Sequence, residues 1–142
     1  MVAGQAAEWD NMTRPVDQGL LEYISRGKTS ALLIAAVKAA GLLAGADEEK
    51  LQALDDYGLH AGLAFQIIDD VLDVEGDDTT LGKPAGSDEE RGLVTFASLL
   101  GCDEARRQAE AEAEAAVAAL AVFGAEADTL RAFPPFFVSR RH

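Results

Sequence analysis

The chain has 142 residues, of which 25 are acidic and 12 basic, so its formal net charge at neutral pH is −13. This charge repels the phosphate backbone of nucleic acids, which argues against them as partners. The length fits one domain, and no apolar run approaches the about 18 residues of a membrane span. The single Cys102 and an amino terminus without a basic leader predict no disulfide, no signal peptide and a cytoplasmic location.

Apolar residues recur at helical spacing and no stretch alternates with period two, which predicts an all-α helical bundle. Ala31, Ala35, Ala36, Ala39 and Ala40 form a small-residue face suited to close packing. In chain order, the expected helices are one that ends near residue 12, followed by helices at 23–43, 47–74, 93–100, 103–123 and 126–142.

Three segments carry more specific expectations. The helix at 47–74 is apolar around much of its circumference and should lie at the centre of the bundle. Residues 75–91 are rich in Gly, Asp and Thr, which predicts a long, mobile loop. Gly124 is expected to cap the helix before it, and Pro134 with Pro135 to interrupt or restart the last helix.

Three aspartates share one face of the helix at 47–74. Asp69, Asp70 and Asp73 lie within one turn of each other, together with Gln66. Like charges at this spacing destabilise a helix by about 0.2–0.5 kcal/mol per pair, so local stability does not favour them. A solvated acidic face is one interpretation, and a magnesium site is the other. The apolar neighbours favour carboxylates that face a cavity.

The segment FQIIDDVLD at 65–73, followed by GD and LGKPAGSD, resembles the second aspartate-rich motif of the trans-isoprenyl diphosphate synthases. This polyprenyl synthetase family includes the farnesyl and geranylgeranyl diphosphate synthases. Three further segments resemble family motifs in the same order: MVAGQ at 1–5, GKTSAL at 27–32 and SLLG at 98–101. The resemblance implies the isoprenoid synthase (terpenoid synthase) fold, with residues 1–142 as the C-terminal half of the domain.

The same resemblance implies a reaction and its cofactor. Asp69 would ligate Mg²⁺ directly, and Asp70 and Asp73 directly or through water. The ions would hold an allylic diphosphate, whose carbocation alkylates isopentenyl diphosphate head to tail with loss of a proton. The implied catalytic and diphosphate-binding residues are Lys28, Thr29, Gln66 and Lys83, with Gln5 as a further substrate-binding residue.

The sequence also departs from the family pattern. No DDxxD segment precedes Asp69, and Glu8, Leu93 and Ser87 replace an aspartate, a basic residue and a lysine that are frequent in the family. We therefore expect the chain to need an N-terminal half, or to form a homodimer, and product chain length is not predicted. A noncatalytic helical subunit and an unrelated acidic bundle are the alternatives.

Two other segments have simpler interpretations. Gly27, Lys28 and Thr29 do not form a nucleotide-binding P-loop, because Glu22 stands where its first glycine belongs and no strand precedes it. His60 is expected to pack or to form a hydrogen bond, since no second His or Cys lies at metal-ligand spacing.

Overall fold

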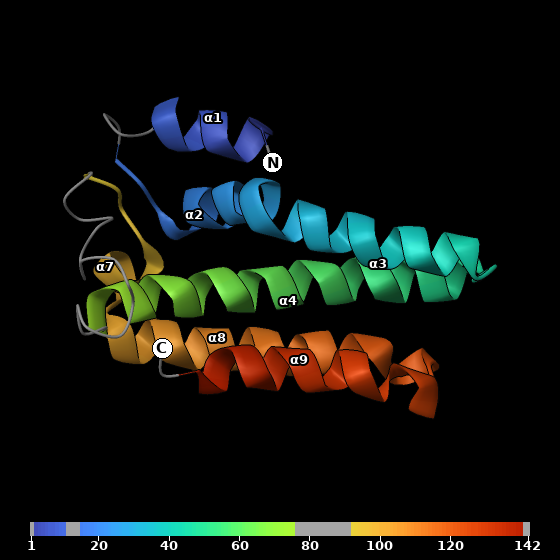
Figure 1. Ribbon diagram of the computed structural model, residues 1–142. Coiled ribbons are helices and arrows are strands. Elements are labelled where there is room, and N and C mark those ends of the chain that lie inside the picture. The colour runs from blue at the N-terminus through green and yellow to red at the C-terminus, as the bar shows by residue number, and fades with distance from the viewer. Residues whose placement is uncertain (1, 11–14, 76–91, 141–142) are drawn as a thin grey trace.

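The computed structural model is a bundle of helices, and it describes residues 2–10, 15–75 and 92–140, apart from the side chains of residues 3 and 10 (Figure 1). No strand occurs in the described residues, which confirms the all-α prediction. None of the described helices has the length and apolarity to cross a membrane. The elements are α1 (Val2–Asp10), α2 (Gln18–Ser25), η1 (Arg26–Ser30), α3 (Ala31–Leu43), α4 (Glu48–Glu75), α7 (Phe96–Leu100), α8 (Cys102–Ala119), η2 (Leu120–Val122), η3 (Ala125–Ala127) and α9 (Asp128–Ser139).

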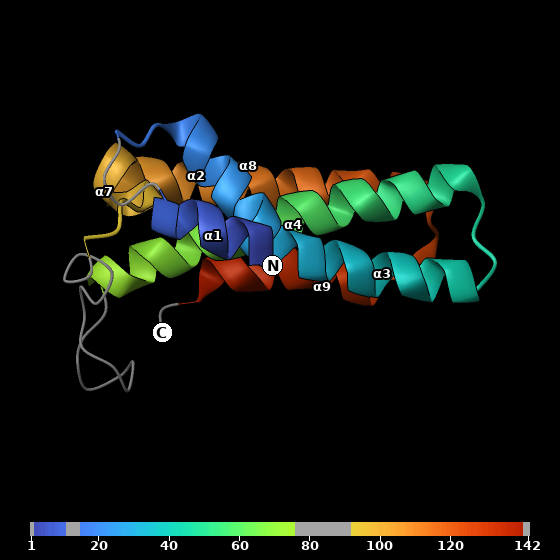
Figure 2. The ribbon, with the colours of Figure 1, turned by 90° about the horizontal axis from the view of Figure 1, so that it is seen from above.

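Helix α4 lies at the centre of the bundle, as its all-round apolar pattern predicts. In Figure 1 it runs between the α2–α3 arm above and α8 with α9 below, and Figure 2 shows the same helices from above. Two apolar clusters form along it, one around Ile67, Ile68 and Phe96 and the other around Leu54 and Leu120. Glu75, the first residue of the predicted loop at 75–91, is the last residue of α4, and residues 76–91 lie outside the described residues.

Helices α3 and α4 approach closely through glycines of α4, not through the alanine face of α3. A Cβ on Gly58 would lie 2.8 Å from the backbone N and Cα of Ile34. Ala35 and Ala36 are exposed, as are Ala39 and Ala40, so the predicted role of this face in close packing within the chain is wrong. The reason is its direction, because these alanines lie on the side of α3 that turns away from α4.

The helical arm before α4 begins earlier than predicted and contains a wide turn. Asp17 caps α2 by accepting a hydrogen bond from the backbone N–H of Leu20 at 2.9 Å. Between α2 and α3, η1 has π-helical geometry and carries Lys28 and Thr29. A single π turn inside an α-helix often marks a functional position. Nothing in the apolar pattern predicted it.

The end of α8 is held by an arginine, and the predicted C-cap at Gly124 is wrong. Gly124 has an extended backbone (φ −82°, ψ −153°) where a glycine cap would adopt a left-handed one. Arg131 of α9 donates instead to the carbonyls of Leu120 at 2.8 Å, Phe123 at 2.6 Å and Gly124 at 2.8 Å. A long-range side chain therefore replaces the local cap.

Helix α9 continues through both prolines, so the predicted interruption is also wrong. Pro134 has no N–H to donate to the carbonyl of Leu130, one helical turn earlier. The hydroxyl of Tyr57 donates to that carbonyl at 2.9 Å. Burial of Tyr57 raises the pKa of its hydroxyl, which keeps it protonated as a donor.

We predict that Tyr57→Phe lowers the free energy of unfolding by about 1–2 kcal/mol, because it leaves the Leu130 carbonyl without its donor. In a Pro134→Ala background the cost should fall below about 0.5 kcal/mol, since the new backbone N–H can donate to Leu130. Urea denaturation measures both values. Tyr23→Phe, at an exposed tyrosine, is the control. An equal cost of Tyr57→Phe in both backgrounds would contradict this account.

Candidate functional site

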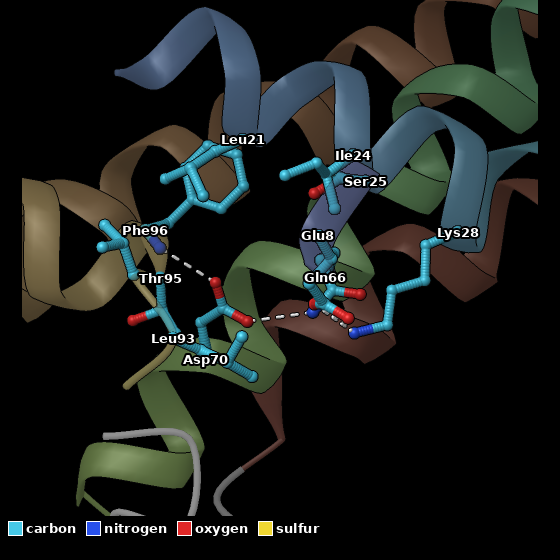
Figure 3. Close-up of a pocket in the computed structure, with 11 residues that line it drawn as sticks. Glu8, Leu21, Ile24, Ser25, Lys28, Gln66, Asp70, Leu93, Thr95 and Phe96 are labelled. Atoms are coloured by element: carbon cyan, nitrogen blue, oxygen red, sulfur yellow. Dashed lines mark hydrogen bonds and ion pairs between the residues drawn. The ribbon is translucent and has the colours of Figure 1, made fainter. Parts of the chain in front are cut away.

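A chain of hydrogen bonds joins η1, α4 and α7 at one end of the bundle. Thr29 Oγ1 donates to Gln66 Oε1 at 2.8 Å, and Gln66 Nε2 donates to Asp70 Oδ1 at 2.9 Å. The backbone N–H of Phe96, the first residue of α7, donates to Asp70 Oδ2 at 2.9 Å (Figure 3). Three predicted site residues are therefore in direct contact, although they come from two separate segments of the chain.

Lys28 lies beside this chain of hydrogen bonds and is paired with an acid. Its Nζ is 2.8 Å from Glu8 Oε1 in α1, and both side chains are partly buried (Figure 3). Gln5, the other residue predicted from α1, is exposed and donates from Nε2 to Glu8 Oε2 at 2.9 Å. Glu8 therefore neutralises Lys28 and also engages Gln5.

The three aspartates differ sharply in exposure. Asp70 and Asp73 are only 6% and 4% exposed, whereas Asp69 is exposed. Consecutive residues of a helix point about 100° apart, so neighbouring carboxylates of α4 face different surroundings. Lys83, the fourth residue predicted to bind diphosphate, lies outside the described residues.

The described carboxylates fit a metal site in which water and substrate fill most of the coordination positions, and not one that protein ligands fill completely. Among the residues that the structure describes, no group of three or more His, Cys, Asp or Glu side chains could hold a metal ion. Magnesium usually takes one or two protein carboxylates and completes its shell with water and substrate phosphate oxygens. The exposed Asp69, one turn before Asp73, fits that requirement.

A small pocket lies between these segments. Its volume is about 30 Å³, room for about one water molecule and far below that of an organic ligand site. A larger ligand therefore does not fit inside it. The pocket is lined by Glu8, Leu21, Ile24, Ser25, Lys28, Gln66, Asp70, Leu93, Val94, Thr95 and Phe96 (Figure 3).

Sequence reasoning missed two groups at this site. Glu8 was noted only as a departure from a motif, and its pairing with Lys28 could have been suspected from charge alone. The N–H of Phe96 is a backbone group, so its side chain gives no signal of the contact with Asp70. His60 does form the expected hydrogen bond, from Nδ1 to Glu112 Oε2 at 2.7 Å.

Helix α4 offers a matched test of the Gln66 contact. Gln66 and Gln52 each donate from Nε2 to Oδ1 of an aspartate one turn later, Asp70 at 2.9 Å and Asp56 at 3.0 Å, but the first contact is partly buried and the second is exposed. Gln66→Ala should lower the free energy of unfolding by about 1–3 kcal/mol, because the buried Asp70 loses a donor. Gln52→Ala should cost at most about 0.5 kcal/mol. Equal costs in urea denaturation would rule out a special role for the Gln66 contact.

Comparison with known proteins places this geometry in a family. The sequence model of the polyprenyl synthetases matches residues 1–127. The farnesyl diphosphate synthase of Geobacillus stearothermophilus is 42% identical over 116 residues, which are 82% of this chain and 39% of that protein. The chain thus spans only about two fifths of this curated relative.

Solved structures share the fold. The polyprenyl synthase of Caulobacter crescentus, complexed with calcium and isoprenyl diphosphate, is 30% identical with a TM-score of 0.87 over 99% of this chain and 56% of that chain. The geranyltransferase of Helicobacter pylori, complexed with magnesium and isoprenyl diphosphate, is 27% identical with a TM-score of 0.79 over 97% of this chain and 45% of that chain. The ordered motifs, the all-helical fold and these matches agree, and the chain belongs to the polyprenyl synthetase family of trans-isoprenyl diphosphate synthases.

Proposed function

We propose that this chain forms the C-terminal half of a trans-prenyltransferase domain, which condenses an allylic diphosphate with isopentenyl diphosphate in isoprenoid biosynthesis. The observation that carries the proposal is the contact of Thr29, Gln66 and Asp70 beside Lys28, which joins two of the family motifs in space. The metal and isoprenyl diphosphate in the complexes of related enzymes support the substrate class.

Each predicted residue has a role in this proposal. Asp69, whose carboxylate is exposed, would hold Mg²⁺ together with the buried Asp73. When bound, the ion supplies positive charge for the diphosphate as the allylic C–O bond ionises. Lys28 and Lys83 add positive charge at the leaving diphosphate, while Thr29 and Gln66 contact the same diphosphate. Gln5, in α1 next to Glu8, is a further substrate-binding residue.

The proposal also requires a larger partner surface. The site pocket holds only about 30 Å³, so a prenyl chain needs walls beyond the described residues that line this pocket. Leu32, Leu42 and Leu43 expose apolar surface along α3, with Leu43 91% exposed. We infer that an N-terminal half covers this face, with a homodimer of complete domains as the further assembly and the cytoplasm as its compartment. No observation favours a noncatalytic subunit.

The function predicts metal-dependent binding of a prenyl diphosphate. Geranyl diphosphate should bind the chain weakly, and only with millimolar Mg²⁺, because a net charge of −13 repels the free anion. Asp69→Ala should abolish this binding, since it removes the exposed carboxylate that receives the ion. Isothermal calorimetry with Mg²⁺ and with EDTA measures both effects.

The control for this experiment is Glu49→Ala, which removes the same charge from an exposed position at the other end of α4. It should leave the affinity unchanged. Equal affinity in EDTA, or equal losses in Asp69→Ala and Glu49→Ala, would refute the metal-bridged site. Binding without formation of a longer prenyl diphosphate by the complete domain would favour the noncatalytic alternative.

The ion pair of Lys28 makes a second prediction. Glu8→Gln should tighten the magnesium-dependent binding of geranyl diphosphate about two- to fivefold. The reason is that the Glu8 carboxylate competes with the diphosphate for the Lys28 ammonium, and this partly exposed ion pair contributes about 1 kcal/mol or less. Glu22→Gln removes the same charge from α2 and should have no effect. Weaker binding by Glu8→Gln would mean that Glu8 holds Lys28 in its productive position.

A further inference from the structure

We propose that Asp70 is a positioning residue, which fixes the amide of Gln66 and the start of α7, and that it is not a metal ligand. The inference rests on the proposed function, because it assigns a task to one carboxylate of the aspartate motif. It departs from the expectation that all three aspartates serve the metal.

The surroundings of Asp70 separate it from its neighbour Asp69. Asp70 is 6% exposed, and each of its two oxygens accepts a hydrogen bond from the protein, Oδ1 from Gln66 and Oδ2 from Phe96. Asp69 is exposed. A metal ion needs carboxylate lone pairs directed toward open space, as Asp69 provides. Both oxygens of Asp70 are instead engaged by donors of α4 and α7.

The charge of Asp70 sets the direction of the whole chain of hydrogen bonds. An ionised carboxylate only accepts, so it holds the Nε2 end of Gln66 toward itself. The Oε1 end of Gln66 then faces Thr29, whose hydroxyl must donate to it. Asp70 therefore determines the orientation of two groups at the proposed substrate surface without touching the substrate.

The second contact of Asp70 holds one wall of the site. The first backbone N–H groups of a helix have no partner within it, and Asp70 accepts the N–H of Phe96. The Phe96 side chain is 1% exposed and packs in the same apolar cluster as Leu21 and Ile67. Since Thr95 and Phe96 line the pocket, this contact fixes α7 relative to α4.

Exchanging the two side-chain types tests the inference. In Asp70→Asn, the side-chain oxygen of residue 70 can still accept from the Phe96 N–H, but its NH₂ group then faces the NH₂ group of Gln66. The Gln66 amide must therefore rotate by 180° to turn its oxygen toward residue 70. Its NH₂ group then points at Thr29, whose hydroxyl must accept a hydrogen bond where it now donates one. This variant should bind geranyl diphosphate with Mg²⁺ about tenfold more weakly, as expected for one buried hydrogen bond of wrong direction. Adding Gln66→Glu gives residue 66 a carboxylate, which accepts from the Thr29 hydroxyl and from the NH₂ group of Asn at position 70. The net charge of the double variant equals that of the original chain. The double variant should recover to within about threefold of the original affinity.

The Mg²⁺ concentration at half-saturation distinguishes positioning from ligation. It should stay the same in Asp70→Asn and in the double variant, and rise only when Asp69 is changed. A rise in Asp70→Asn that Gln66→Glu does not reverse would assign Asp70 to the metal and overturn the inference. The matched control is the same exchange at Gln52 and Asp56, which should change neither quantity.

Amide hydrogen exchange separates this inference from the proposed function. In the 142-residue chain without ligand, Asp70→Ala should speed exchange of the Phe96 amide about tenfold or more, and Asp69→Ala should not. If the Phe96 amide exchanges faster in Asp70→Ala but the unchanged chain does not bind geranyl diphosphate, the proposed function is refuted and the positioning role of Asp70 is not. An unchanged Phe96 exchange rate in Asp70→Ala would refute the positioning role, whatever the chain binds.

Discussion

A carboxylate inside an apolar bundle must be hydrogen-bonded, and Asp70 meets this constraint at the point where three elements meet. Its burial in α4 would cost several kcal/mol without partners. Gln66 supplies one donor and the first N–H of α7 supplies the other, while Thr29 of η1 completes the chain through Gln66. The requirement to satisfy one charge therefore connects the π turn, the central helix and α7, and these are the elements that carry the site.

The same rule shapes the opposite end of the bundle. There the groups without a backbone partner in their own helix are carbonyls. One is that of Leu130, to which Pro134 has no N–H to donate, and the others lie at the end of α8. Tyr57 of α4 donates to the first, and Arg131 of α9 donates to the others. Long side chains from a neighbouring helix thus take the place of local caps at this end. Helix α4 supplies Tyr57 at this end of the bundle, and Gln66 and Asp70 at the other. Changes in this helix should therefore affect the fold and the site together.

Local patterns predicted the helices, and long-range contacts produced the differences. The all-round apolar pattern of 47–74 is a property of consecutive residues, so the central position of α4 was predictable. The passage of α9 through Pro134 depends on Tyr57, far away in sequence, and no local rule contains that contact. The pairing of Lys28 with Glu8 and the acceptance of the Phe96 N–H by Asp70 are equally non-local. Family resemblance supplied the candidate site residues, which stay a prediction, and it assigned all three aspartates to the metal.

Charge explains why the aspartates need different roles. Lys28 lines the same pocket as Asp70, and Glu8 already balances its charge, so the described residues there offer no net attraction to a diphosphate. A divalent cation reverses that balance only if at least one carboxylate is free to reach it. Asp69 is exposed and can do so, while Asp70 is already engaged by Gln66 and Phe96. An adjacent pair of like charges thus divides into an exposed carboxylate, which we propose for the metal, and a buried one that is hydrogen-bonded to two neighbouring parts of the structure.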